Sequence, residues 1–82
     1  MPLVVHPNIY DAVWIEGVHN SINHYLIFAL IKFESGFRPR VVGDNGTSFG
    51  LMQLNLGGAG AGHTYEELLD IDSNVRLGVA TL

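Results

Sequence analysis

One carboxylate in this sequence has a setting that suits acid catalysis. Glu34 ends a run of apolar residues with the pattern of a helix, and a serine and a glycine follow it directly. The macrodipole is negative in the last turn of a helix and burial disfavours a charge, so we expect a raised pKa for this carboxyl. Such a group can give a proton to a glycosidic oxygen near neutral pH. The residues alone also allow a solvated glutamate at a helix end, or one paired with Lys32 or Arg38.

Four neighbouring residues could complete a site around Glu34, and each also has a purely structural interpretation. Ser35 could orient the glutamate or contact substrate, or its hydroxyl could bond the helix backbone. Gly50 would let a sugar or another backbone approach closely, or it marks a bulge. Met52 suits a core or the floor of a cleft. Gln53 could bind a substrate amide or hydroxyl, or hold the loop beside Glu34 together.

Two polar residues further along the chain, one of them a carboxylate, could also belong to the site. Asp44 could activate a water molecule, as the base of a glycosidase does, or form an Asx turn before Asn45 and Gly46. Asn55 could bind substrate or take part in a turn. The four histidines are scattered and none has metal-ligand spacing with a partner, so we expect no metal and no cofactor.

Length and composition limit the class of protein. The chain has 82 residues, 48% of them hydrophobic and 15% charged, which favours one globular domain. Its net charge is −4 with only 4 basic side chains, so nucleic acid is not an expected partner. The chain has no cysteine, which excludes disulfides and thiolate metal sites. The low charged fraction predicts that some apolar surface needs a partner.

The pattern of the chain predicts the elements that must position these residues. We expect a helix over 9–18 with Pro7 in its first turn. A second helix over 22–35, capped by Ser21 or Asn23, is apolar around most of its circumference and should be central and buried on several sides. A β-hairpin or an irregular pair of strands should follow over 41–54. A capping box of Thr64 and Glu67 opens a short helix over 65–70, and Asp72 caps a last helix.

The order of the motifs resembles that of a known family. Glu-Ser-Gly-Phe-Arg-Pro at positions 34–39 precedes Gly46 and then Gly-Leu-Met-Gln at 50–53, and Asp-Ser-Asn-Val-Arg-Leu-Gly stands at 72–78. Together these segments resemble the catalytic core of the soluble lytic transglycosylases, which cut peptidoglycan, over about residues 25–82. The resemblance implies a mainly α, α+β lysozyme-like fold with a small β-hairpin. It also implies one domain over 1–82, with its catalytic core at 24–55.

The resemblance also implies a mechanism. Glu34 would be the sole acid and base, first protonating the bond between N-acetylmuramic acid and N-acetylglucosamine. It would then accept the proton of the muramoyl 6-hydroxyl, so the product would be a 1,6-anhydro sugar formed without water. Ser35 would help hold the muramoyl unit, and Met52 and Gln53 would shape and contact the glycan cleft, beside Gly50.

Goose-type lysozymes share the glutamate and the Gly-Leu-Met-Gln segment, which keeps a hydrolytic alternative open. Their loop carries an aspartate at the place of Asp44, and a second aspartate often follows the strand where this chain has Asn55. The resemblance to them implies hydrolysis of the same peptidoglycan substrate, with Asp44 positioning the water.

One departure from the family pattern leads to further expectations. Family domains usually continue through an Ala-Tyr-Asn-Ala-Gly segment that lines the site, and this sequence corresponds to the N-terminal portion. We therefore expect exposed apolar surface, and self-association or a partner chain that completes the cleft. A third hypothesis is a catalytically incomplete glycan-binding or assembly subunit. A peptidoglycan substrate implies action outside the cytoplasm, although no signal peptide is visible before Pro7.

Overall fold

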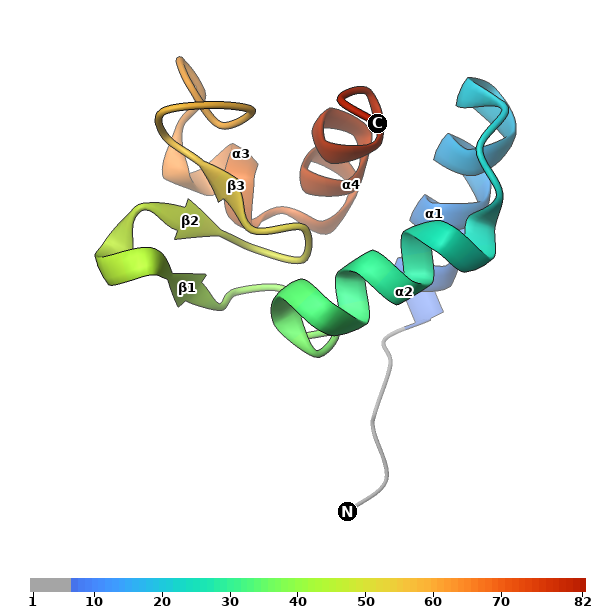
Figure 1. The fold of residues 1–82 in the computed structure, drawn as a ribbon, viewed down its shortest axis with the longest axis horizontal. Helices are drawn as coiled ribbons and strands as arrows, with labels where there is room; N and C mark the ends of the chain where they lie inside the picture. Colours follow the sequence, from blue (N-terminus) through green and yellow to red (C-terminus); the bar gives the residue numbers. More distant parts are fainter. Residues whose placement is uncertain (1–6) are drawn as a thin grey trace.

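The computed structural model describes residues 7–82, which form a mostly helical domain with one small sheet (Figure 1). The helices are α1 (Pro7–Asn20), α2 (His24–Ser35), α3 (Tyr65–Leu69) and α4 (Ile71–Val79). The strands are β1 (Val42–Gly43), β2 (Ser48–Phe49) and β3 (Leu54–Asn55), with a 3-10 turn, η1 (Asp44–Gly46), between the first two. The expected mainly α, α+β fold is confirmed. The segment in which no signal peptide was expected lies mostly outside the described residues.

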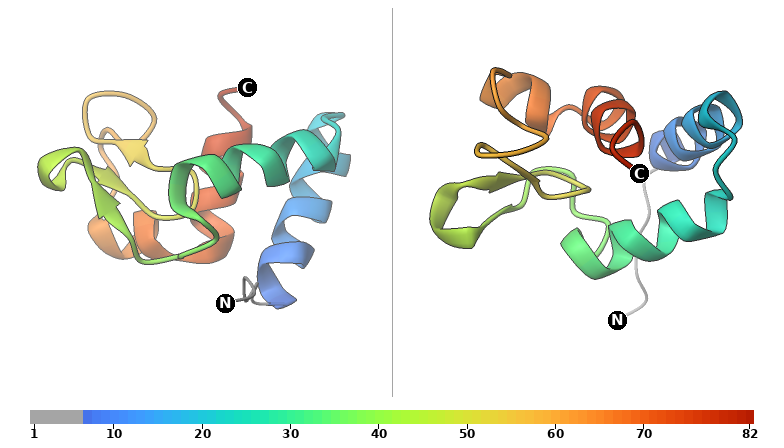
Figure 2. Two further views of the ribbon diagram at one scale, coloured as in Figure 1. Left: turned by 60° about the horizontal axis from the view of Figure 1, so that its bottom comes forward. Right: turned by 45° about the horizontal axis from the view of Figure 1, so that its top comes forward.

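Helices α1, α2 and α4 form the helical part of the molecule and enclose its larger core. In Figures 1 and 2 they lie together on one side, while the sheet and α3 lie on the other. The core joins the three helices to the segment after β2, and its members are Ile9, Ala12, Val13, Ile27, Ile31, Leu51, Val75 and Val79. Fully burying an isoleucine contributes roughly 2 kcal/mol. None of the helices in the described part of the chain has the length and apolar character needed to cross a bilayer.

Defined caps set both ends of α2. Asn23 has extended backbone angles, and its side chain accepts a hydrogen bond from Tyr25 N at 2.8 Å. Gly36 ends the helix in the left-handed region with a φ of 60°, and its N–H donates to Lys32 O at 3.0 Å. Of the two caps expected from the sequence, Asn23 is the one used. These caps place Glu34 in the last turn, as expected.

The expectation that α2 is buried on several sides needs correction. Only Ile27, Ile31 and Ser35 of this helix are buried, and they lie on one face. Leu26 is 52% exposed and Phe33 is 85% exposed. A helix that is apolar all round has no periodic signal to distinguish its packed face from its open one, which is why the sequence did not predict this arrangement.

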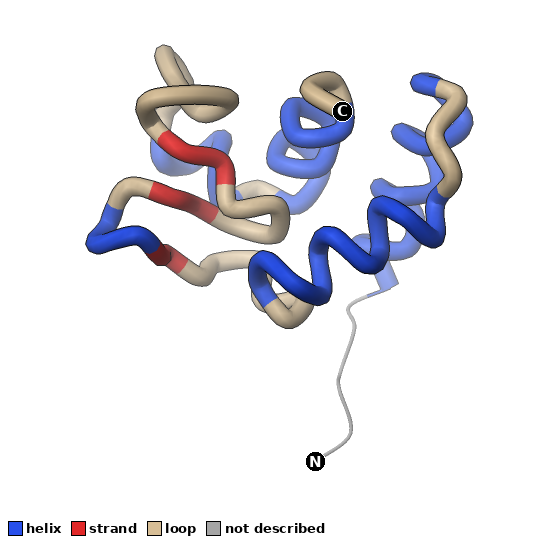
Figure 3. The backbone as a smooth tube through the Cα atoms, in the orientation of Figure 1, coloured by secondary structure: helices blue, strands red, loops and turns tan. Residues whose placement is uncertain are grey.

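The sheet has three strands instead of the two that the sequence predicted (Figure 3). β1 pairs with β2 and β2 pairs with β3, both antiparallel, in the order β1-β2-β3. The third strand forms because Gly50 and Gln53 have φ values of 76° and 48°, in the left-handed region. The turn they form brings Leu54 opposite Phe49. A second small core of Phe49, Leu54 and Leu68 fixes α3 against this sheet.

The caps of the last two helices agree with the sequence at one point and differ at another. The capping box of Thr64 and Glu67 is present at the start of α3, as expected. The cap of α4 is Asp70, whose side chain accepts from Ser73 N at 3.0 Å, and the expected cap, Asp72, lies inside the helix. The two aspartates are only two residues apart, and the end of α3 at Leu69 decides between them.

Candidate active site

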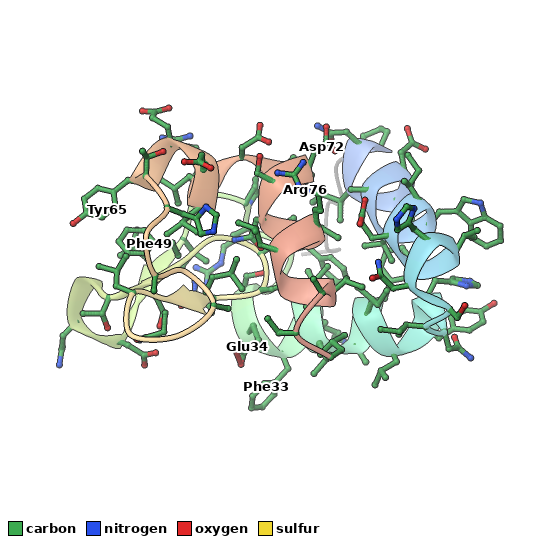
Figure 4. All side chains as sticks on the ribbon, turned by 90° about the horizontal axis from the view of Figure 1, so that it is seen from above. Phe33, Glu34, Phe49, Tyr65, Asp72 and Arg76 are labelled. Carbon is green, nitrogen blue, oxygen red and sulfur yellow. The ribbon has the colours of Figure 1, made fainter. Side chains whose placement is uncertain are left out.

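Glu34 is exposed in the last turn of α2. Figure 4 shows its carboxylate and the ring of Phe33 extending beyond the same edge of the molecule. The carboxylate lies near the negative end of the helix dipole, as expected. Its expected burial is wrong, because the described residues leave it open to solvent. Glu34 therefore can reach a ligand that approaches this edge.

Ser35 fixes the helix end that carries the glutamate. Its side chain is 1% exposed, and its hydroxyl donates to Ile31 O at 3.0 Å. Arg38 Nε donates to Ser35 O at 2.9 Å, which satisfies a carbonyl at the end of the helix and places a positive charge there. The structure thus gives Ser35 the backbone-bonding role that the sequence left open.

The Gln53 side chain closes the turn that contains Gly50. Its Nε2 donates to Val41 O at 3.1 Å and to Gly50 O at 3.0 Å, and Gly50 N donates to Val41 O at 2.8 Å. These bonds tie the segment after α2 to the segment after β2. Of its two expected roles, Gln53 therefore performs the structural one, and its side chain is only half-buried.

Asn74 of α4 connects the elements around Gly50, and sequence reasoning gave it no role. Its Nδ2 donates to Leu68 O at 2.7 Å and Phe49 O at 2.9 Å, while its Oδ1 accepts from Met52 N at 2.9 Å. The side chain is completely buried. A Cβ on Gly50 would overlap Asn74 Nδ2 and Leu68 O, so the close approach at Gly50 is made by the protein itself. The only signal in the sequence was the position of Asn74 within the segment 72–78.

Met52 joins the two cores. It is half-buried and packs against both hydrophobic clusters. A Cβ on Gly78 would overlap Met52 Sδ, so α4 can approach this side chain only because position 78 is a glycine. The structure therefore gives Met52 a packing role, which is one of the two that its residue type suggested.

Asp44 and Asn55 are brought together through Ser48, a residue that sequence reasoning missed. Ser48 Oγ donates to Asp44 Oδ2 at 2.6 Å and accepts from Asn55 Nδ2 at 3.0 Å. Ser48 and Asn55 are opposite each other in the register of β2 and β3, and Ser48 is 1% exposed. Asp44 and Asn55 are both exposed, so the network holds two open polar groups at one edge of the sheet.

Among the described residues we find no candidate metal site, and the carboxyl with a shifted pKa lies at the cap of α3. No group of three histidine, aspartate or glutamate side chains within 7–82 could hold a metal ion. The pKa of Glu67 is lowered, first by its hydrogen bond with the Thr64 backbone and then by those with the side chains of His63 and Thr64. This group caps α3 and takes no part in the arrangement around Glu34.

Large apolar side chains are exposed over much of the described surface, as expected from the composition. Those more than half exposed are Tyr10, Trp14, Ile15, Val18, Tyr25, Leu26, Phe33, Tyr65 and Leu82. Pockets on the described surface include three: one at the junction of α3 and α4 beside Asn8 and Pro39, one at the α1–α2 turn, and one between α1 and α4. Glu34 is not in the lining of any of these three.

The chain matches a protein-family model over most of its length. The sequence model of the family described as "Transglycosylase SLT domain" matches residues 12–82. This range contains Glu34, the Gly-Leu-Met-Gln segment and the whole of α4. Comparisons with curated proteins and with solved structures give no significant match.

Proposed function

The chain belongs to the transglycosylase SLT domain family, and from this membership we propose that it is a lytic transglycosylase of peptidoglycan. The bond cleaved would be the one between N-acetylmuramic acid and N-acetylglucosamine. The family match over residues 12–82 carries the proposal. In it the whole of 1–82 is one lysozyme-like domain, and residues 24–55 are its catalytic core.

In this mechanism Glu34 acts twice. Its carboxyl first donates a proton to the glycosidic oxygen, so that the N-acetylglucosamine unit leaves as an alcohol. The carboxylate then takes the proton of the muramoyl 6-hydroxyl while that oxygen bonds to the anomeric carbon. The product is a 1,6-anhydro sugar, and no water is consumed. The exposure of Glu34 at the end of α2 supports the proposal, because a long glycan strand must be able to reach the carboxyl.

Some of the other site residues would hold the backbone of the site in place, and others would contact the glycan. Ser35 and Gly50 would act by holding the helix end and the turn in place, since both are buried in protein contacts. Met52 and Gln53 are half-buried and would shape the cleft floor beside them. Asp44 and Asn55 are exposed and would contact the glycan directly.

A second candidate function is hydrolysis of the same bond in the manner of a goose-type lysozyme. The observation in its favour is the fixed position of the Asp44 carboxylate, to which the buried Ser48 hydroxyl donates at 2.6 Å. A carboxylate held in this way could orient a water molecule for attack on the sugar. The second oxygen of that carboxylate accepts no hydrogen bond from a described side chain, so it is free for this role.

Exposed apolar surface next to Glu34 supports a proposal about partners. Leu26 and Phe33 lie on the open face of α2, at 52% and 85% exposure. We propose that a second copy of the chain or a partner chain covers this face and completes the cleft. Without such a partner the chain would be the third candidate, a subunit that binds glycan without cutting it. Its peptidoglycan substrate would place the protein outside the cytoplasm.

A wall-clearing assay tests the role of Glu34. We expect Glu34→Gln to lower the rate of clearing of a peptidoglycan suspension by about 100-fold or more, because it removes the only proposed acid. Glu16→Gln on α1 is the matched control, and it should clear walls at the wild-type rate. Both variants should keep the wild-type circular dichroism spectrum. Equal clearing by Glu34→Gln and the control would refute the assignment of Glu34.

A further inference from the structure

A hollow lies between the end of α1 and the start of α2. Its lining consists of Trp14, Gly17, Val18, Ser21, Ile22, Asn23 and His24. His24 and Glu34 stand ten residues apart at opposite ends of α2, which corresponds to about 15 Å along the helix axis. The hollow is therefore separate from the proposed catalytic site.

Trp14 provides a flat apolar surface in this hollow. The side chain is 58% exposed, and the His24 ring packs edge-on against it with the ring centroids 5.0 Å apart. His24 is held in turn by Tyr25, at a centroid distance of 4.3 Å. A large aromatic ring that is already fixed loses little conformational entropy when a ligand stacks on it.

Two polar groups of the hollow have no hydrogen-bond partner among the described residues. The Oδ1 of Asn23 caps α2, but its Nδ2 and the Ser21 hydroxyl bond no group within residues 7–82. No lysine, arginine, aspartate or glutamate lines the hollow. Ser21 has a φ of 56°, a left-handed conformation that costs free energy for any residue with a side chain. An uncharged ligand with an apolar face and a polar edge matches this lining.

We propose that the hollow is a second, non-catalytic binding site for N-acetylated saccharide units. One face of a sugar ring stacks on Trp14, and its hydroxyl or acetamido oxygens accept hydrogen bonds from Asn23 and Ser21. The identification of the saccharide as a unit of the peptidoglycan strand rests on the proposed function. The site holds the strand at one end of α2 while Glu34 acts at the other.

Trp14 is the only tryptophan of the chain, so its fluorescence reports directly on this hollow. We expect a saturable change in emission when N-acetylglucosamine tetramer is added to the Glu34→Gln variant, which cannot consume it. On the same background, Trp14→Ala should weaken binding to insoluble peptidoglycan by about 10-fold, the loss of one aromatic stacking contact. Ile15→Ala is the matched control, since Ile15 is 59% exposed on the same helix but outside the lining.

The outcomes separate this site from the proposed function. A saturable fluorescence change in Glu34→Gln, together with a wild type that releases no glycan product, would refute the cleavage activity and leave the site standing. A flat titration, or equal wall binding by Trp14→Ala and Ile15→Ala, overturns the site whatever the activity. So does a change of oligomeric state in Trp14→Ala with wall binding intact, which would mark a protein contact. If Trp14→Ala does not fold, Trp14→Phe keeps an aromatic ring and should bind walls better than Trp14→Leu.

Discussion

Replacement of Asn74 by alanine should destabilise the domain more than any comparable change at a polar residue of the described chain. The substitution leaves the carbonyls of Phe49 and Leu68 and the amide of Met52 without their partner. Each lost bond costs about 1 kcal/mol, and the buried cavity adds to this, for a total of about 3–4 kcal/mol. An 82-residue domain has roughly 4–12 kcal/mol of stability in all.

Urea unfolding followed by circular dichroism measures this effect. The midpoint for Asn74→Ala should fall by roughly 2–3 M, at a typical slope for a small domain. Asn55→Ala is the control, because Asn55 also makes three side-chain hydrogen bonds but is exposed, and it should cost about 1 kcal/mol or less. Asn74→Asp keeps the volume but removes both donor hydrogens, and should be at least as unstable as Asn74→Ala. Equal midpoints for Asn74→Ala and Asn55→Ala would refute the reasoning.

Three further predictions concern other parts of the structure. Gly50→Ala should lower the free energy of unfolding in urea by more than about 2 kcal/mol, because φ is 76° and the new Cβ would overlap Leu68 and Asn74. Gly46→Ala is the control: its Cβ meets no atom within 4 Å, so only about 1 kcal/mol of stability should be lost, to backbone strain. The lowered pKa of Glu67 stabilises the fold above the unfolded value of 4.5, and this contribution is lost as the pH falls through the folded value. Glu67→Gln should therefore show a weaker loss of stability on acidification below pH 4.5 than the wild type, and an unchanged pH profile would contradict the cap. Asp44→Asn should leave anhydro-sugar formation almost unchanged, whereas loss of all product would favour the hydrolytic alternative.

Local signals in the sequence predicted the ends of several elements correctly. Asn23 and Gly36 at the ends of α2, and the capping box of Thr64 and Glu67, depend on neighbours within a few residues, so the sequence contains the whole of their physical cause. The position of Glu34 in the last turn of α2 follows from these caps.

Features that depend on distant residues could not be predicted in the same way. The three hydrogen bonds of Asn74 reach Phe49, Met52 and Leu68, and nothing near Asn74 in the sequence indicates them. The open face of α2 was also missed, since its residues are as apolar as those that pack. Ser48 connects Asp44 to Asn55 only because the register of β2 and β3 places it opposite Asn55.

The central claim is that Glu34 cleaves peptidoglycan without water, and the mass of the glycan product tests it most directly. Purified peptidoglycan would be digested with the wild type and with Glu34→Gln, and the released muropeptides analysed by mass spectrometry. We predict 1,6-anhydro-muramoyl ends with the wild type and none with the variant. Reducing ends, which are one water heavier, or the same products from both proteins, would contradict the claim.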